Sequence, residues 1–331
     1  MNIIIKIRAR FLLGINILML ILTPGCSIEE PAASLETFTS AGEKWGIYQL
    51  DLETEEISLL YGAEAEISGL SLDPSGTKLV FSQKTGGDSY EYTEIYTFSI
   101  VDQITEKLTE NSMWDLYPVW SPDGSEIAFL SWRESSLDIY RMDGDGSNQG
   151  LLYDSSHHDA DIDWGDEQIV FTSQDRIWII DSAGQNPRSL TNPPRAGEWG
   201  HANLPFGDYD PRLSPDGTRI IFSRMIGDES THGNYDIFQV NLNGSELLNL
   251  TRTGYSQGLT SWSYSGNEIL FIVAAIEGRG VYDLYTMNSD GSEVKLRTPE
   301  NVPPEFLIHC ARYANDSLTV YLVGQWWEEE K

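Results

Sequence analysis

The chain has 331 residues and carries 51 acidic against 21 basic side chains, a net charge of −30 at pH 7. A surface this acidic repels the phosphate backbone of nucleic acids and anionic lipid headgroups, so we expect no nucleic-acid partner. It favours divalent cations and basic partners, although a coat of solvated acidic loops would give the same composition.

The first 25 residues have the pattern of an export signal. Lys6, Arg8 and Arg10 give a basic start, and residues 11–22 form an apolar run that is short for a membrane span. Residues 22–26, LTPGC, resemble a bacterial lipobox. The pattern predicts cleavage after Gly25 and acylation of Cys26, and multiple acyl chains anchor a protein stably. An ordinary secretory peptide, or an uncleaved anchor with a chance cysteine, is the alternative.

We therefore predict a lipoprotein signal peptide in residues 1–25 and a polar tether in residues 26–44. The predicted location is exported and membrane-anchored through the lipidated Cys26, on the periplasmic or cell-surface side. The second cysteine, Cys310, lies in an apolar stretch. We expect it to be a small buried side chain without a disulfide partner.

A unit of strand, turn and strand then recurs six times, in residues 67–82, 116–130, 159–173, 209–223, 259–272 and 306–323. The last aromatic residues of these units are Phe81, Phe129, Phe171, Phe222, Phe271 and Tyr321, so that successive units lie 42 to 51 residues apart. A near-constant period of this size in strand-forming sequence is typical of a β-propeller.

Each repeat predicts one blade of four antiparallel strands. Ser121-Pro122-Asp123-Gly124 has the residues of a tight turn, because proline presets φ and glycine accepts the left-handed position. Short apolar stretches on both sides of this turn predict the first and second strands. A pattern such as Asp138-Ile139-Tyr140 marks the third strand, and the fourth ends near a pair such as Leu108-Thr109.

The two ends of the chain complement each other. Residues 47–50 and 58–60 have the patterns of a third and a fourth strand but precede any first strand. Residues 306–323 supply a first and a second strand at the other end. Joining them removes the free sheet edges. We predict an all-β, six-bladed propeller over residues 45–325 whose last blade is closed by the amino- and carboxy-terminal strands, followed by a tail at 326–331.

The repeat resembles the TolB-type propeller repeat, in which a tryptophan precedes Ser-Pro-Asp-Gly and an Asp-Ile-Tyr pattern follows. The resemblance covers residues 45–323. Blade three departs from it at residues 164–167, where the proline is lost, and blade six at 314–316, where proline and glycine are both lost. TolB carries a separate α/β domain before its propeller, and the segment after Cys26 is too short to hold one. The resemblance implies protein interaction at the cell envelope.

One face of the predicted ring gathers histidine and aromatic residues on loops. The loops from strand four to strand one and from strand two to strand three share this face, and the longest are 192–211 and 224–235. Such loops over a rigid scaffold indicate a binding surface. Packing of the loops on one another is an equally open interpretation. The candidate binding residues are Trp114, Tyr117, His157, His158, Trp199, His201, Tyr209 and His232.

Two motifs look like enzyme or calcium sites but have simpler interpretations. Residues 254–258, GYSQG, match a nucleophile pattern and are followed by Asp283 and His309. That serine needs a strand–elbow–helix setting, whereas here we expect a loop between blades. Residues 143–147, DGDGS, lack the later ligands of a calcium loop and are predicted to be a hairpin turn.

The sequence favours a non-enzymatic envelope lipoprotein that binds a protein or a glycan, acts as a monomer and needs no cofactor or metal. The alternative is a metal-dependent polysaccharide lyase or another propeller enzyme. It would be supported if three or more of His157, His158, His201 and His232 converged around a common point, as the ligands of a metal ion do.

Overall fold

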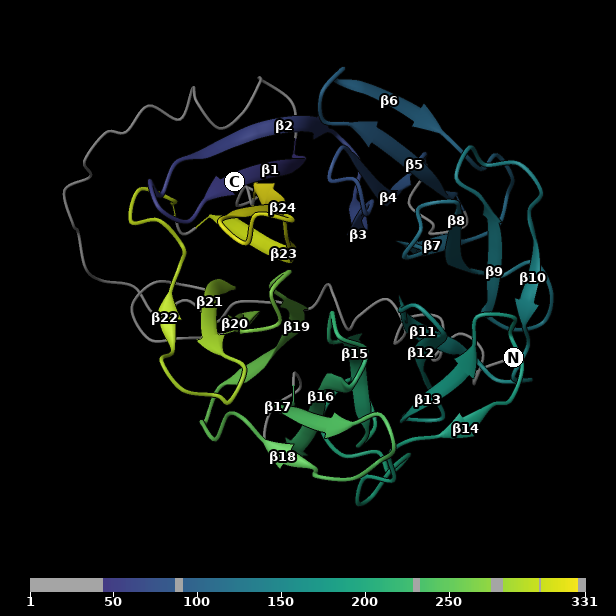
Figure 1. The fold of residues 1–331 in the computed structure, drawn as a ribbon, viewed down its shortest axis with the longest axis vertical. Helices are drawn as coiled ribbons and strands as arrows, with labels where there is room; N and C mark the ends of the chain where they lie inside the picture. The colour runs from purple at the N-terminus through teal and green to yellow at the C-terminus, as the bar shows by residue number, and fades with distance from the viewer. Residues whose placement is uncertain (1–43, 87–91, 229–232, 275–281, 304, 327–331) are drawn as a thin grey trace.

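The computed structural model describes residues 44–86, 92–228, 233–274, 282–303 and 305–326. These residues form six four-stranded antiparallel sheets arranged as a ring around a central axis (Figure 1). The predicted all-β, six-bladed propeller is therefore confirmed. Among the described residues there is no helix long and apolar enough to cross a membrane.

The strands of blades one to three follow one another from the axis outward. Blade one contains β3 (Ile67–Leu72), β4 (Lys78–Lys84), β5 (Thr93–Ser99) and β6 (Ile104–Lys107). Blade two contains β7 (Asp115–Trp120), β8 (Glu126–Ser131), β9 (Asp138–Asp143) and β10 (Gly150–Tyr153). Blade three contains β11 (Asp159–Trp164), β12 (Gln168–Ser173), β13 (Arg176–Asp181) and β14 (Arg188–Ser189).

Blades four and five repeat this order, and blade six combines both ends of the described chain. Blade four contains β15 (Asp208–Leu213), β16 (Arg219–Gly227), β17 (Asn234–Asn241) and β18 (Leu248–Asn249). Blade five contains β19 (Ser256–Trp262), β20 (Glu268–Ala274), β21 (Asp283–Asn288) and β22 (Lys295–Leu296). Blade six contains β23 (Phe306–Tyr313), β24 (Thr319–Trp326), β1 (Trp45–Asp51) and β2 (Ile57–Ala63).

The ring is closed by pairing between β1 and β24. Every residue of β1 has a partner, from Trp45 opposite Gln325 to Asp51 opposite Thr319. In Figure 1 the purple β1 and β2 continue the sheet of the yellow β23 and β24. Because β1 pairs with β24 from Thr319 to Gln325, neither strand is left as a free sheet edge.

The turns between the first two strands have the geometry that their residues predict. In blade two, Gly124 has φ of 72° and its N–H donates to the Ser121 carbonyl at 2.9 Å. The Ser121 hydroxyl accepts the Glu126 N–H at 2.9 Å. Asp123 accepts hydrogen bonds from the backbone and side chain of Ser125, which lower its pKa to about 2. Blade four repeats this network around Ser214, which shows that the turn is set by local sequence.

A threonine that lies two residues after the fourth strand has a fixed structural role in four of the blades. Its Oγ1 accepts the backbone N–H at the start of the third strand, at 2.8 to 3.0 Å, in blades one, three, four and five. The four residues are Thr109, Thr191, Thr251 and Thr298. These bonds hold the outer strands where the regular ladder is only two to four residues long.

The hydrophobic core lies between neighbouring blades. The aromatic residues that mark the repeat are all buried in the second strands: Phe81, Phe129, Phe171, Phe222, Phe271 and Tyr321. One core cluster joins Val80 and Ile95 of blade one to Trp120 and Phe129 of blade two. Cys310 is buried beside Trp45 and Tyr321, as predicted for a small hydrophobic side chain.

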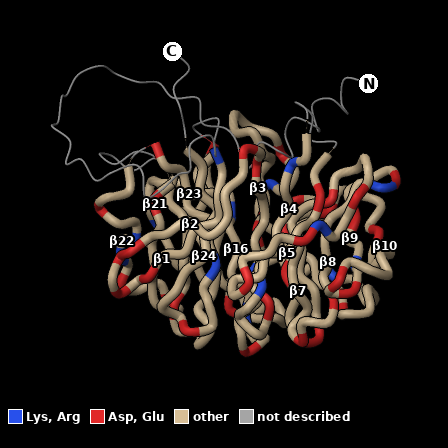
Figure 2. The backbone as a smooth tube through the Cα atoms, turned by 90° about the horizontal axis from the view of Figure 1, so that it is seen from above, with Lys and Arg blue, Asp and Glu red and all other residues tan. Residues whose placement is uncertain are grey.

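The two faces of the ring differ in their connections. All six first strands run away from the same face, which carries the β14–β15 loop at 190–207 and the other connections between blades. β1 enters from this face too, because Trp45 pairs with Gln325 and Phe306 with Trp326. The opposite face carries the short turns. Figure 2 shows acidic residues spread over both faces and the rim, as in a coat of solvated acidic loops.

The predicted long loop at 224–235 is wrong. β16 continues to Gly227 and β17 begins at Asn234, with Met225 opposite Tyr235 and Gly227 opposite Asn234. The pairing extends the hairpin, so that only residues 228–233 lie between the two strands. The fourth strands of blades three to five have two residues each, fewer than the four of blades one and two.

Candidate site at the mouth of the central channel

Every inner strand carries an irregularity in its pairing at the same level of the ring. The register shifts fall within residues 68–70, 116–119, 160–163, 209–212, 258–261 and 308–310. In the first five strands the shift contains a residue with left-handed φ, between 50° and 63°: Gly69, Tyr117, Asp161, Asp210 and Leu259. A β-bulge of this kind turns side chains away from the alternation of the strand.

Four of these five positions hold a residue other than glycine, which costs roughly 1 kcal/mol or more each. At the fifth, a Cβ on Gly69 would lie 2.8 Å from the Cα of Tyr117, so only glycine fits without movement. Backbone strain that recurs around one axis, at one level, is typical of a functional site. The bulges therefore direct attention to the channel.

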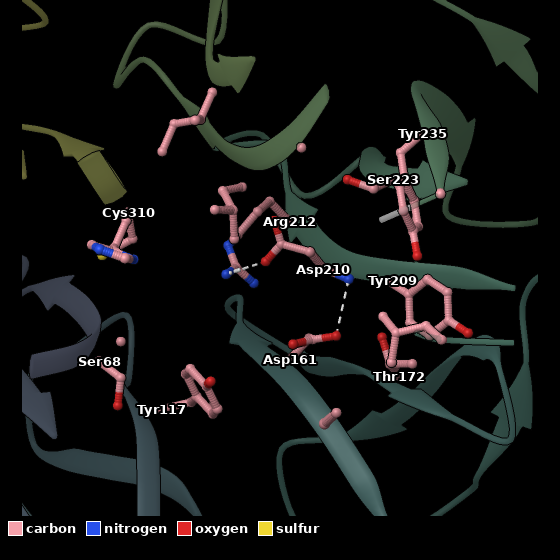
Figure 3. Close-up of a pocket in the computed structure, with 18 of the residues that line it drawn as sticks. Ser68, Tyr117, Asp161, Thr172, Tyr209, Asp210, Arg212, Ser223, Tyr235 and Cys310 are labelled. Atoms are coloured by element: carbon pink, nitrogen blue, oxygen red, sulfur yellow. Dashed lines mark hydrogen bonds and ion pairs between the residues drawn. The ribbon is translucent and has the colours of Figure 1, made fainter. Parts of the chain in front are cut away.

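A cavity of about 720 Å³ opens at this level (Figure 3). All six inner strands contribute to its wall, together with the β14–β15 loop and the β12–β13 turn. Residues near the mouth include His157, Gln174, Trp199, Asn203 and Tyr255, and residues farther along the inner strands include Asp161, Asp210, Arg212, Cys310 and Arg312. The cavity thus combines an aromatic and polar mouth with a charged interior.

The charged interior is linked from blade to blade. The Arg212 Nη2 atom lies 2.6 Å from Asp210 Oδ1, and the Asp210 N–H donates to Asp161 Oδ2 at 3.2 Å, as the dashed lines of Figure 3 show. Asp210 Oδ2 in turn accepts the N–H of Thr260 in the next blade at 3.1 Å. Asp163 in blade three accepts the N–H of Leu213 in blade four at 2.8 Å. The channel carboxylates thus hold adjacent blades together.

Burial changes the ionisation of these acids. It raises the pKa of Asp161 to about 6; the nearby Asp210 carboxylate raises it further and Arg212 opposes the shift. Burial also raises the pKa of Asp163, against the opposing effect of Arg212. Both shifts make these carboxyl groups easier to protonate than an exposed aspartate.

Tyr209 fixes the β14–β15 loop against the neighbouring blade. Its hydroxyl lies 2.9 Å from Asp175 Oδ1 and 2.7 Å from the Pro205 carbonyl oxygen. Its ring meets the ring of Tyr235 at 6.2 Å, edge to face. Tyr209 lies in β15 and not in the predicted loop at 192–211, and it packs and hydrogen-bonds as well as lining the cavity.

The structure brings five of the eight predicted binding residues together. Tyr117, His157, His158, Trp199 and Tyr209 all line the cavity. Trp114 is buried with its ring 5.1 Å from Trp132 and does not line it. His201 is exposed outside the lining, with its N–H donating to Asp228 at 3.1 Å. His232 lies outside the described residues.

The two neighbouring histidines differ in their surroundings. His158 accepts the Leu137 N–H at Nδ1, 3.1 Å away, and its ring lies 4.5 Å from the Trp132 ring in a tilted arrangement. Burial lowers the pKa of His158, which favours the neutral ring. His157 is exposed. Among the described residues, which exclude His232, no group of three or more His, Cys, Asp or Glu side chains could hold a metal ion.

The two discounted motifs lie where a propeller places them. Ser256 begins β19, so residues 256–258 lie in an inner strand and not in the predicted loop between blades. The strand continues to Trp262 instead of turning directly into a helix, so the nucleophile elbow is not formed. His309 lies in β23 with Nε2 2.8 Å from Gln325 Oε1, and Asp283 begins β21. Residues 143–147 form the β9–β10 hairpin turn, in which the Gly146 N–H donates to the Asp143 carbonyl at 2.9 Å.

The charged channel residues were not among the predicted site residues. Asp161, Asp210, Arg212 and Arg312 lie in inner strands, which the repeat pattern assigns to the core. The available signal was the presence of charged residues inside DADIDW (159–164), DYDPRL (208–213) and FLIHCARY (306–313). A charge at the middle of an otherwise buried strand indicates a wall that faces a cavity.

Together, the six four-stranded blades, the terminal closure and the channel cavity define a β-propeller with one open, loop-rich mouth. The model of the TolB beta propeller domain matches residues 13–198, more than half of the chain. The chain therefore belongs to the TolB β-propeller family, as the repeat motifs predict.

Individual relatives are distant. An uncharacterized protein of Agrobacterium fabrum is 23% identical over 215 residues, which cover 61% of this chain and 68% of that one. The structure of a putative TolB from Agrobacterium tumefaciens matches with a TM-score of 0.63 at 18% identity, over 86% of this chain and 99% of that chain. TolB from Acinetobacter baumannii matches with 0.58 at 16% identity, over 86% and 65%. At these identities, the two structures show that the chain shares their fold.

Proposed function

We propose that the protein is a cell-envelope lipoprotein that binds a segment of a protein or a glycan in the channel mouth, without converting it chemically. The observation that carries this proposal is the cavity of about 720 Å³ into which all six blades direct side chains. Its volume lies in the range of about 300 to 1,000 Å³ that is usual for ligand sites. It would hold an extended chain or a few sugar rings.

The residues at the mouth have the chemistry of recognition. Trp199 is 49% exposed and Tyr255 is 39% exposed, and both line the cavity beside Gln174 and Asn203. Aromatic side chains offer large apolar contact with few rotatable bonds, and amide groups supply directional hydrogen bonds. Such a mixed surface suits peptide backbones and sugar rings.

The position of β1 sets the place where a tether would join the propeller. The described chain begins at Lys44, whose carbonyl accepts the Trp326 N–H at 2.8 Å on the face that carries the mouth. A tether from Cys26 would therefore join the propeller beside the cavity. Residues 1–43, including the predicted signal and Cys26, lie outside the described residues.

The anchor is tested by replacing the predicted acylation site. In Cys26→Ser the sulfur that would accept the lipid is missing, so we expect incorporation of labelled palmitate to fall to background and the protein to leave the membrane fraction or stay unprocessed. A Cys310→Ser variant, which alters the buried cysteine, should keep its label. Undiminished labelling of Cys26→Ser would refute the lipoprotein proposal.

The mouth is tested by removing its exposed rings. Trp199→Ala combined with Tyr255→Ala should weaken binding to arrayed peptides or oligosaccharides by about tenfold or more, because exposed aromatic anchors dominate many interfaces. The matched control is Tyr264→Ala, which removes a 66% exposed ring from the β19–β20 turn on the opposite face.

The outcome is judged by binding and by stability together. Both the double variant and the control should melt within a few degrees of the parent, whereas Tyr209→Ala should melt lower because its hydroxyl and ring hold the β14–β15 loop. Binding that is equal in the double variant and in the control would contradict a ligand site at the mouth.

A further inference from the structure

Two arginines reach into the channel interior, and only one has an acidic partner. Arg212 in β15 is paired with Asp210 at 2.6 Å. Arg312 in β23 donates from Nη1 to two main-chain carbonyl oxygens, those of Thr260 at 3.3 Å and Ala311 at 2.9 Å. Within the described part of the chain, no carboxylate lies within ion-pair distance of Arg312.

The carboxylates of the channel already have other donors. Asp210 accepts from Arg212 and from the Thr260 N–H, Asp163 from the Leu213 N–H, and Asp161 from the Asp210 N–H. Other buried arginine–carboxylate contacts also form within one blade, such as Arg224 with Asp208. Arg312 is thus a cation that lines the cavity and for which the surrounding blades supply carbonyl oxygens alone.

The pKa values of the Arg212 and Arg312 guanidinium groups are shifted in opposite directions. Burial opposes the charge on Arg212, but Asp210, Asp163 and Asp161 outweigh it and raise its pKa. Burial and the positive charge of Arg212 lower the pKa of Arg312, and the more distant acids do not make up the difference. An arginine in this setting gains from an added anion, and its planar donors fit a carboxylate well.

We propose that Arg312 binds the terminal carboxylate of a peptide that enters the channel from the loop-rich mouth. The inference rests on the proposed binding function and names the group that the cavity recognises. Arg312 follows His309 and Cys310 along β23, in the direction away from the mouth. A ligand group that contacts Arg312 must therefore lie near the end of an extended ligand chain.

The charge of the protein favours a peptide end over an acidic polysaccharide. At a net charge of −30, the surface opposes the approach of a ligand that carries a negative charge on every residue. A peptide brings one carboxylate at its end, and basic side chains farther along it would be attracted by the acidic surface. The rings of Trp199 and Tyr255 at the mouth suit the preceding residues.

The probe is a pair of randomised hexapeptide pools that differ only at the carboxy terminus, which is free acid in one and amide in the other. We expect the immobilised protein to retain the free-acid pool about tenfold more than the amide pool, as is usual for a lost charge-assisted contact. Arg312→Gln should abolish this preference, and Arg312→Lys should restore part of it, because the charge returns without the planar fork.

The matched control is Arg252→Gln, which removes the same charge from an exposed residue of the β18–β19 loop on the mouth face. It should keep the free-acid preference. Circular dichroism melting shows whether each variant folds. If Arg312→Gln does not fold, the comparison of the two pools on the parent protein still tests whether the protein prefers a free terminal carboxylate.

Equal retention of the two pools by the parent protein would overturn the inference. If that occurs while retention still depends on Trp199 and Tyr255, the mouth binds peptides by other contacts and the proposed function stands. Retention of uronic-acid oligomers but of neither peptide pool would also overturn it, in favour of a glycan ligand. Failure of every peptide and glycan probe would count against both the inference and the proposed function.

Discussion

Replacing Asp208 with alanine is expected to lower the free energy of unfolding by about 3 to 5 kcal/mol, because it leaves a buried guanidinium without its carboxylate. Arg224 Nε donates to Asp208 Oδ1 at 2.6 Å, and Arg224 Nη2 donates to Oδ2 at 2.8 Å. Asp208 is fully buried, and burial raises its pKa even though Arg224 opposes the shift. Folding has already removed both charges from water, so the loss of one partner leaves the other charge buried and uncompensated.

A double-mutant comparison separates the pair from simple loss of packing. Asp208→Ala with Arg224→Met removes both charges, and we expect it to recover much of the stability lost by Asp208→Ala alone. Urea unfolding at pH 7 measures the parent, Asp208→Ala, Arg224→Met and the double variant. If the double variant is as unstable as the sum of its two single variants, the two charges are not coupled and the explanation fails.

The chain supplies an exposed pair as a control. Arg195 Nε lies 2.8 Å from Glu198 Oε2, but the two side chains are 49% and 59% exposed. Glu198→Ala should therefore change the unfolding free energy by about 0 to 1 kcal/mol. The two ion pairs have similar distances, so the difference between them would measure the effect of burial.

Removing the amino-terminal strands is expected to abolish the soluble, folded propeller. A chain that starts at Glu64 lacks β1 and β2, and so leaves the eight residues of β24 as an open edge. It also removes Ile47, Tyr48 and Leu50, which are at most 1% exposed, from the core of blade six. Loss of one large buried side chain costs about 2 to 5 kcal/mol, so loss of several should exceed the stability of the domain.

The comparison is with a chain that starts at Lys44 and retains both strands. Size-exclusion chromatography and thermal melting should show a monomer with one cooperative transition for this chain, and aggregate or no transition for the shorter one. Adding a peptide of residues 44–63 during refolding should restore part of the soluble material, because it supplies the missing partner of β24. A cooperative, soluble fold without β1 and β2 would show that the closure is dispensable.

The closure also bears on the candidate site, because β23 belongs to the blade that it completes. Arg312 and Cys310 lie in β23, and Arg312 reaches the Thr260 carbonyl of the neighbouring blade. An open ring would let blade six move relative to blade five, and the channel wall would lose its spacing. Ring stability and ligand binding should therefore fall together in variants of β1, whereas variants of Trp199 should affect binding chiefly.

The sequence alone determined the number of blades, the order of strands and the family. These features depend on local chemistry: proline, aspartate and glycine in the turns, aromatic residues in the second strands, and a period near 50 residues. The ends of the chain indicated the closure for the same reason, since complementary half-blades leave one simple arrangement. The loop-rich face followed from the topology, and five of its predicted residues do meet at one cavity.

Only the tertiary structure decided what faces the channel. Each inner strand has a bulge, and a bulge changes which side chains point to the axis, so simple alternation cannot assign them. Asp161 meets Asp210, and Arg312 meets Thr260, across 49 and 52 residues of sequence, because the ring sets neighbouring blades side by side. Arg212 has its carboxylate two residues away in its own strand, at Asp210, whereas Cys310 holds that position before Arg312. The contact of Arg312 with the Thr260 carbonyl depends instead on the spacing between blades, which no local pattern records.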